Sequence, residues 1–177
     1  MKRIMVAGCM LSFAFATNAQ AADREEIGTD IAIALPLVAG GITLSKQDWT
    51  GSLQLIVDTS LTVGTAYALK KVIHEQRPDK SDNKSFPSDT AALAFAPAQF
   101  LWDRYGWRYG LPAYLTAGLV AWSRVDQRRH HSWDVVASAA IAFGYSKLIT
   151  TEYRGNGFYS SAGALPGGGY VNMGWRW

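Results

Sequence analysis

Cysteine is almost missing from this sequence. The single cysteine, Cys9, lies within an N-terminal apolar segment. An intramolecular disulfide needs two thiols and a structural zinc site usually needs several ligands of this kind. The sequence therefore excludes a disulfide scaffold and a cysteine-ligated metal centre. Stability must come from a packed core, for which one domain of 177 residues is large enough.

Long uninterrupted apolar runs are also missing. Asp58 interrupts one apolar segment, and Pro36 and Pro97 interrupt two others. Most segments have 12 to 17 residues, whereas a membrane span needs about 20. Together with the mean hydropathy of −0.02, this favours helices buried in a soluble or membrane-associated bundle. An integral membrane bundle, with residues 51–72 as one span, is the alternative. The segments are Ile31–Leu44, Leu53–Leu69, Ala91–Trp102, Leu111–Trp122 and Val135–Ile149.

The sequence has no long run of lysine or arginine, no zinc finger and no recognition-helix pattern. Its formal net charge is only +3, with a pI near 9.0. This small excess is compatible with an anionic small molecule, a lipid phosphate or a membrane surface. It does not favour nucleic acid, so we expect no nucleic-acid partner.

Residues 1–22 have the pattern of a secretory signal peptide. Lys2 and Arg3 supply the charged start, a short apolar core follows, and Ala19 and Ala21 fit a small-residue cleavage site. We therefore expect export to the bacterial periplasm. The alternative is the inner membrane, with the active site facing the periplasm.

An all-α fold is expected for residues 23–153, as a bundle of about five to six helices. Alanine, leucine and valine recur there at helical spacing, and alternating patterns are few. Residues 154–177 differ, because glycines and aromatic residues are frequent. Val171–Trp177 alternates like a short strand. We expect an irregular tail that folds back over the bundle or stays mobile.

Three short polar clusters separate the apolar segments. In the first, Lys70, His74 and Arg77 are spaced so that a helix would place them on one face, and Pro78 predicts that the helix ends at Arg77. Such a cationic stripe suits a phosphate-like anion, or it is only a solvated basic face. In the second cluster, Ser88 predicts a helix N-cap, and helix N-termini bind anions.

The third cluster combines an imidazole with a carboxylate. His130 and Asp134 are one helical turn apart, and Arg124 lies just upstream. Asp134 can accept a hydrogen bond from one ring nitrogen and leave the other free as a nucleophile. Arg124 can bind the same anion. Alone, this spacing is common by chance; the three clusters together in this order are far more specific.

Their order and spacing resemble the type 2 phosphatidic acid phosphatases, a superfamily that includes vanadium haloperoxidases and bacterial class A acid phosphatases. The family pattern is Lys, six residues, Arg-Pro; then Pro-Ser-Gly-His; then Ser-Arg, five residues, His, three residues, Asp. The resemblance covers roughly residues 50 to 150. The matching positions are Lys70, Arg77, Pro78, Pro87, Ser88, Ser123, Arg124, His130 and Asp134.

The resemblance implies a role for each matching side chain. His130 attacks phosphorus and forms a phosphohistidine, and Asp134 orients it. For the phosphatases, the resemblance implies no metal and no cofactor. The phosphoryl oxygens are bound by Lys70, Arg77, Ser88 and Arg124.

The second cluster departs from the family pattern, because Asp89 and Thr90 stand where the family has Gly-His. In the family that histidine protonates the leaving group, and general acid catalysis typically contributes about 10²–10⁴-fold. A like-charged neighbour favours a protonated carboxyl group, so Asp89 is a candidate replacement acid. His74 and His131 are other candidates. Asp89 is equally interpreted as a first-turn acid favoured by the helix dipole.

The expected function is an exported phosphatase of a phosphomonoester or diphosphate, with a lipid or isoprenoid phosphate as the preferred substrate class. Two alternatives follow from the altered cluster. One is a weakened family member that binds phosphate-bearing ligands without efficient turnover. The other is a vanadate-dependent peroxidase, which would also need the missing histidine.

Overall fold

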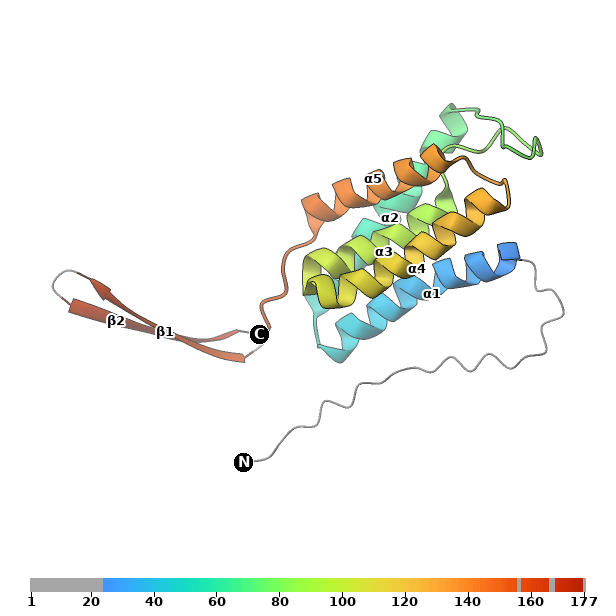
Figure 1. Cartoon of the computed structure of the whole chain (residues 1–177). Helices are drawn as coiled ribbons and strands as arrows, with labels where there is room; N and C mark the ends of the chain where they lie inside the picture. The colour runs from blue at the N-terminus through green and yellow to red at the C-terminus, as the bar shows by residue number, and fades with distance from the viewer. Residues whose placement is uncertain (1–23, 156, 166–167, 177) are drawn as a thin grey trace, which may run out of the picture.

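Five helices form a bundle in the computed structural model, which describes residues 24–155, 157–165 and 168–176 (Figure 1). The predicted all-α bundle is confirmed, and each predicted apolar segment lies in one helix. The predicted signal peptide lies outside the described residues. The helices are α1 (Arg24–Ser45), α2 (Trp49–Val72), α3 (Asp89–Tyr105), α4 (Trp107–Asp126) and α5 (Ser132–Ile149).

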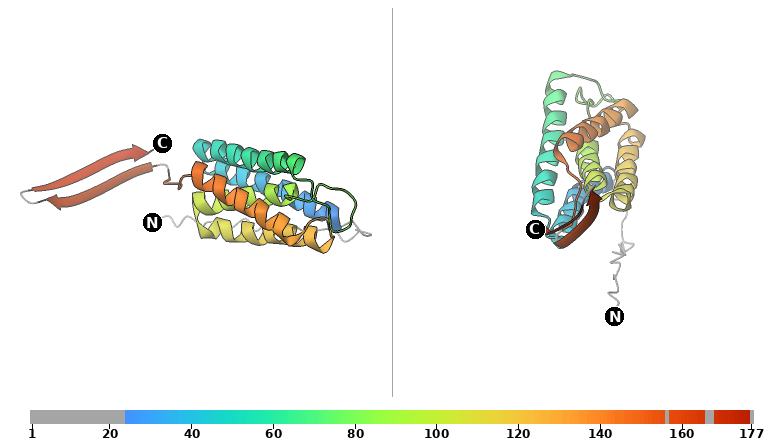
Figure 2. Two further views of the ribbon diagram at one scale, coloured as in Figure 1. Left: turned by 90° about the horizontal axis from the view of Figure 1, so that it is seen from above. Right: turned by 90° about the vertical axis from the view of Figure 1, so that its left-hand side faces the viewer.

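The chain runs up and down, so the connections gather at two ends of the bundle (Figures 1 and 2). We call the end with the α2–α3 connection (73–88) and the α4–α5 connection (127–131) the loop end. The far end holds the α1–α2 connection, the turn at Gly106 and the residues that follow α5. Gly106 has a φ of 81°, which favours glycine and allows α4 to start directly after α3.

Helix α3 is the centre of the bundle and packs against all four other helices. Its buried surface consists largely of small side chains, which let the neighbouring helices approach closely. Phe100 and Leu101 fill the remaining core space with Leu55 of α2 and Val120 of α4. The buried alanines of α3 are Ala91, Ala92, Ala94, Ala96 and Ala98.

A buried ion pair closes the far end. Arg104 donates from Nε and Nη2 to the two carboxylate oxygens of Asp48, at 2.7 and 2.5 Å. Its Nη1 donates to Thr151 O at 2.7 Å, and Tyr105 donates to Asp48 Oδ2 at 2.7 Å. Burial raises the pKa of Asp48, but the hydrogen bonds from Arg104 and Tyr105 outweigh it and hold that pKa below its usual value. This network joins the start of α2 and Thr151, which follows α5, to the end of α3.

Large apolar side chains cover the outer faces of the bundle. Leu37 is 70% exposed, Leu115 65% and Leu148 83%. By length and composition, α1 is able to cross a membrane over Glu26–Ser45, alone among the helices of the described chain. The bundle is therefore less polar outside than its low mean hydropathy indicates.

The tail was predicted to be irregular and to cover the bundle or stay mobile, and the structure corrects this. Strands β1 (Gly157–Leu165) and β2 (Gly168–Arg176) pair as an antiparallel hairpin that extends away from the far end (Figures 1 and 2). The alternating pattern explains the strand β2. Gly163 faces Tyr170 across the hairpin, and a Cβ there would lie 2.6 Å from the Tyr170 ring, so glycine permits the pairing.

Candidate active site

The first cluster starts on α2 but leaves the helix early. Lys70 is buried in the last turn of α2, which ends at Val72 because Ile73 takes an extended conformation (φ −97°, ψ 107°). The prediction that His74 and Arg77 continue the helical face is therefore wrong. Both residues lie in the connection to α3.

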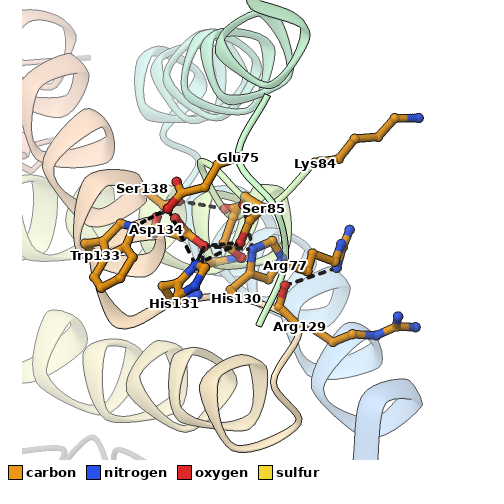
Figure 3. Close-up of polar contacts among 12 residues, drawn as sticks. Glu75, Arg77, Lys84, Ser85, Arg129, His130, His131, Trp133, Asp134 and Ser138 are labelled. Atoms are coloured by element: carbon orange, nitrogen blue, oxygen red, sulfur yellow. Dashed lines mark hydrogen bonds and ion pairs between the residues drawn. The ribbon is translucent and has the colours of Figure 1, made fainter. Parts of the chain in front are cut away.

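That connection folds on itself and reaches the α4–α5 connection. Arg77 N donates to Asp82 O, and Ser85 N donates to Glu75 O, both at 2.9 Å. Arg77 Nη1 donates to Arg129 O at 3.3 Å. The guanidinium of Arg77 therefore lies beside the residue that precedes His130, as Figure 3 shows.

Asp82 holds the other side of the Arg77 guanidinium. Arg77 Nε donates to Asp82 Oδ1 at 2.8 Å, and Lys84 N donates to the same oxygen at 2.8 Å. Desolvation raises the pKa of Asp82, but the Arg77 hydrogen bond and the Lys84 amide outweigh it and keep that pKa below its usual value. The Asp82 side chain is 41% exposed, so an incoming anion can compete with it for Arg77.

Ser88 and Asp89 begin α3 next to Lys70. Ser88 is fully buried and its Oγ accepts from Ala91 N at 3.3 Å, which confirms the predicted N-cap. Asp89 Oδ1 pairs with Lys70 Nζ. The Lys70 side chain is 9% exposed and the Asp89 side chain 44%. The lysine predicted to bind phosphate thus holds a carboxylate that solvent reaches.

His130 is buried immediately before α5. Its Nδ1 lies 2.7 Å from Ser85 O. A carbonyl oxygen only accepts hydrogen bonds, so Nδ1 carries the proton and Nε2 keeps its lone pair while the ring is neutral. Nε2 is therefore the nitrogen able to act as a nucleophile.

Asp134 is fully buried in the first turn of α5. Its Oδ2 accepts from Ser85 Oγ at 2.5 Å and from His131 N at 2.8 Å, and it lies 3.6 Å from His130 Nδ1. That last distance is too long for a direct hydrogen bond, in contrast to the predicted contact. Asp134 instead holds the hydroxyl of Ser85, and the carbonyl of Ser85 holds the imidazole (Figure 3).

Hydrogen bonds between α3 and α5 bring the second and third clusters together. Ser88 N donates to Asp134 O at 3.3 Å, and Ser138 Oγ donates to Ser88 O at 2.7 Å. The start of α3 is thereby held beside the start of α5. Ser88, Asp134 and His130 consequently share one small region of the loop end.

Arg124 approaches this region from the last turn of α4. Its backbone oxygen accepts from His130 N at 3.2 Å. Its buried guanidinium is directed to α1, where Nη2 donates to Thr29 Oγ1 at 3.0 Å. A Cβ on Gly28 would lie 2.7 Å from Arg124 Nη2, so glycine permits this close packing.

Two further histidines were candidate acids. His74 is exposed in the α2–α3 connection. The ring of His131 stacks on Trp133, with centroids 4.3 Å apart, and its Nδ1 lies 3.6 Å from both Glu75 Oε1 and Asp134 Oδ2. The contacts of the His131 ring therefore help to fix the start of α5.

Within the described residues, one group has the ligand types of a metal site: Glu75, His131 and Asp134, whose ligand atoms lie within 4.8 Å of one another. One oxygen of each carboxylate in this group is already engaged. Glu75 Oε1 accepts from Trp133 Nε1 at 2.8 Å, and Asp134 Oδ2 accepts two hydrogen bonds. The contacts are those of a hydrogen-bonded network that fixes the α4–α5 connection.

Sequence reasoning missed Ser85, Gly28 and Thr29. Ser85 is fully buried and joins His130 to Asp134, although 45 residues separate it from His130. Its only signal was a polar residue just before the second cluster. Gly28 and Thr29 lie on α1, outside all three clusters, and only the packing of α1 on α4 brings them to Arg124.

Comparisons with known proteins identify relatives of this chain. A family model described as the PAP2 superfamily matches residues 52–157, which include all three clusters. Lipid A 4'-phosphatase of Helicobacter pylori (strain J99) is 34% identical over 141 residues, which cover 73% of this chain and 71% of that protein. The crystal structure of Aquifex aeolicus LpxE has a similar fold, with a TM-score of 0.58 and 21% identity, over 70% of this chain and 83% of that chain.

Proposed function

This chain belongs to the PAP2 superfamily and is a phosphoric ester hydrolase, and we propose that it dephosphorylates a lipid phosphate through a phosphohistidine on His130. The observation that carries the proposal is the hydrogen bond between His130 Nδ1 and Ser85 O, at 2.7 Å. It fixes the tautomer and leaves Nε2 as the nucleophile. The similarity to a lipid A 4'-phosphatase supports a phosphate on an amphipathic lipid as the substrate class.

In the first step, His130 Nε2 attacks phosphorus while the bond between phosphorus and the leaving oxygen breaks. Lys70, Arg77 and Arg124 meet the negative charge on the phosphoryl oxygens, and Ser88 adds a hydroxyl donor. The buried carboxylate of Asp134 stabilises the positive charge that develops on the imidazole. Water then attacks the phosphohistidine, which releases orthophosphate and restores the neutral ring.

The leaving oxygen needs a proton, and we assign this role to Asp89. Without substrate, Asp89 is a carboxylate held by Lys70. A phosphoryl group that takes Lys70 releases the Asp89 side chain, which is 44% exposed and can take up a proton from solvent. Asp89 then has a proton to donate where the departing alkoxide forms.

A catalytically weakened binding protein is the second candidate function. Thr90 occupies the position of the family's acid histidine. Asp89 is paired with Lys70, which is one of the proposed phosphate ligands. Such a protein would bind phosphate-bearing lipids at the same residues and release little phosphate. Turnover by the wild-type chain separates the two functions.

We place the bundle in a membrane, with the loop end at one surface. Exposed tryptophans mark both ends: Trp49 and Trp107 at the far end, Trp122 and Trp133 at the loop end. Tryptophan concentrates at both interfaces of a bilayer. Helix α1, which alone among the described helices is long and apolar enough to cross a membrane, has 22 residues and is about 33 Å long, against a hydrocarbon core of about 30 Å.

The periplasmic location rests on the signal-like residues 1–22. The start of α1 and the active site both lie at the loop end (Figure 1). Export of the segment before α1 therefore places the active site on the periplasmic face. We propose this orientation, in which lipid phosphates of the outer leaflet reach His130 from the side.

The test is phosphate release by the purified full chain in detergent, with a lipid phosphate and with an aryl phosphate. We expect His130→Asn to lower the rate at least about 10³-fold, because the covalent path loses its nucleophile. The matched control is His74→Asn, which changes an exposed histidine of the neighbouring connection. Equal rates for wild type and His130→Asn contradict the proposal. Binding of lipid phosphate by a wild-type chain that releases none favours the second candidate.

A further inference from the structure

An apolar groove lies between α1 and α4 at the loop end. Its volume is about 250 Å³. Ile27 and Ile31 of α1 form one wall, and Leu119 and Trp122 of α4 form the other. Leu119 is 62% exposed and Trp122 59%, so the groove opens on the outer face of the bundle.

The groove reaches one of the proposed phosphate ligands. Gly28 lines it and also contacts Arg124, since a Cβ on Gly28 would lie 2.7 Å from Arg124 Nη2. Ser123, adjacent to Arg124 in the sequence, lines it as well. Arg124 does not line the groove, but its guanidinium lies behind Gly28, so a molecule in the groove ends next to it.

One polar side chain in the groove lacks a partner. Both Nε2 and Oε1 of Gln127 are buried and make no hydrogen bond with another described residue. A buried amide in this state costs free energy, about 1–3 kcal/mol for each unsatisfied group. A ligand group that accepts a hydrogen bond from Gln127 Nε2, with or without donating one to Oε1, would remove part of this cost.

The charges in the groove exclude the phosphoryl group itself. None of the described residues that line the groove is a cation, and Asp126 adds a negative charge at the rim. The volume is also below the range of about 300–1,000 Å³ for sites that enclose a whole small molecule. The occupant is therefore an uncharged, apolar segment of a larger ligand.

We propose that the α1–α4 groove binds an acyl chain of the lipid phosphate, with Gln127 hydrogen-bonded to the ester, amide or hydroxyl group at the head of that chain. This inference rests on the proposed function and specifies how that function selects a lipid. The chain lies along Leu119 and Ile27, and the phosphoryl group lies beyond Gly28 at Arg124. An aryl phosphate reaches the same cations without entering the groove.

The experiment compares substitutions of two exposed aliphatic side chains, Leu119 and Ile56. Leu119→Trp fills the groove, whereas Ile56→Trp fills a second cavity between α1 and α2, which lies away from the clusters. Leu119 and Ile56 are both 62% exposed, so the two substitutions are matched in exposure. We expect Leu119→Trp to raise KM for a long-chain lipid phosphate at least about 10-fold, as for other misfitted apolar pockets. Its KM for p-nitrophenyl phosphate, and both KM values of Ile56→Trp, should stay within about 2-fold of wild type.

Binding of a fluorescent long-chain lipid phosphate gives a readout that needs no turnover. Weaker binding to Leu119→Trp and to Gln127→Leu, with normal binding to Ile56→Trp, supports the groove even if the wild type releases no phosphate; that outcome contradicts only the proposed function. Unchanged lipid KM and unchanged lipid binding in Leu119→Trp overturn the groove. A changed oligomeric state with unchanged lipid binding would assign the groove to a second copy of the chain, and this also overturns the proposal.

Discussion

Each end of the bundle holds an arginine that is almost fully buried, but the two arginines donate hydrogen bonds to different kinds of partner. At the far end, Arg104 donates to both oxygens of Asp48 and to Thr151 after α5, so its hydrogen bonds are made inside the protein. At the loop end, Arg124 donates to the neutral hydroxyl of Thr29. The carboxylate of Asp48 accepts from two nitrogens of one guanidinium, so Arg104 is committed to a partner inside the protein.

The ion pairs at the two ends differ in the same way. Asp48 is 4% exposed at the side chain, whereas Asp89 and Asp82, the partners of Lys70 and Arg77, are 44% and 41% exposed. In both loop-end pairs the carboxylate is exposed, so solvent screens the pair, whereas both side chains of the far-end pair are buried. The far end therefore serves stability, and at the loop end we propose that phosphate displaces exposed carboxylates from Lys70 and Arg77.

The largest expected effect is on Asp89. Asp89→Asn removes the proposed acid, so we expect hydrolysis of an alkyl phosphate to slow by about 10²–10⁴-fold. An aryl phosphate, whose leaving group needs less protonation, should slow far less. Phosphate release from both substrates measures this difference, with Asp82→Asn as the control that removes the other exposed partner of a cation. An equal loss on both substrates would assign Asp89 to binding rather than to proton transfer.

The second effect is on stability. Arg104→Met leaves Asp48 as an uncompensated buried charge, and breaking a buried pair costs about 3–5 kcal/mol. We expect unfolding at lower temperature or denaturant concentration, with kcat unchanged while the chain is folded. Arg108→Met, at an exposed position of α4, is the control and should change the unfolding free energy by less than about 0.5 kcal/mol. A loss of kcat in folded Arg104→Met would remove the division between the two ends.

The smallest effect tests how α1 positions Arg124. Gly28→Ala places a methyl group where Arg124 Nη2 and Ser123 Oγ now lie, so the guanidinium must move. A hydrogen bond to a charged group contributes about 1.5–3 kcal/mol, so we expect kcat/KM to fall by about 10- to 150-fold. Gly40→Ala is the matched control, because a Cβ there meets no atom within 4 Å. If both variants keep wild-type kcat/KM, Arg124 is not a phosphate ligand.

Much of this site was predictable because its residues are close to one another in sequence. Ser88 was recognised as an N-cap from its own neighbours, and His130 and Asp134 were correctly expected near each other, although Ser85 rather than a direct hydrogen bond joins them. Arg77 shows the limit of local reasoning. Its spacing from Lys70 fits a helical face, but α2 ends at Val72, and Arg77 instead contacts Asp82 and Arg129.

The sequence by itself determined the five helices and the three clusters, since helical periodicity, capping and motif spacing act within a few residues. Only the tertiary structure decided that Ser85 links the imidazole to Asp134, that α1 provides Gly28 to Arg124, and that Asp89 holds Lys70. Each of these contacts joins different elements of the chain. Their partners are set by how the helices pack, and packing depends on all the side chains at once rather than on any one segment.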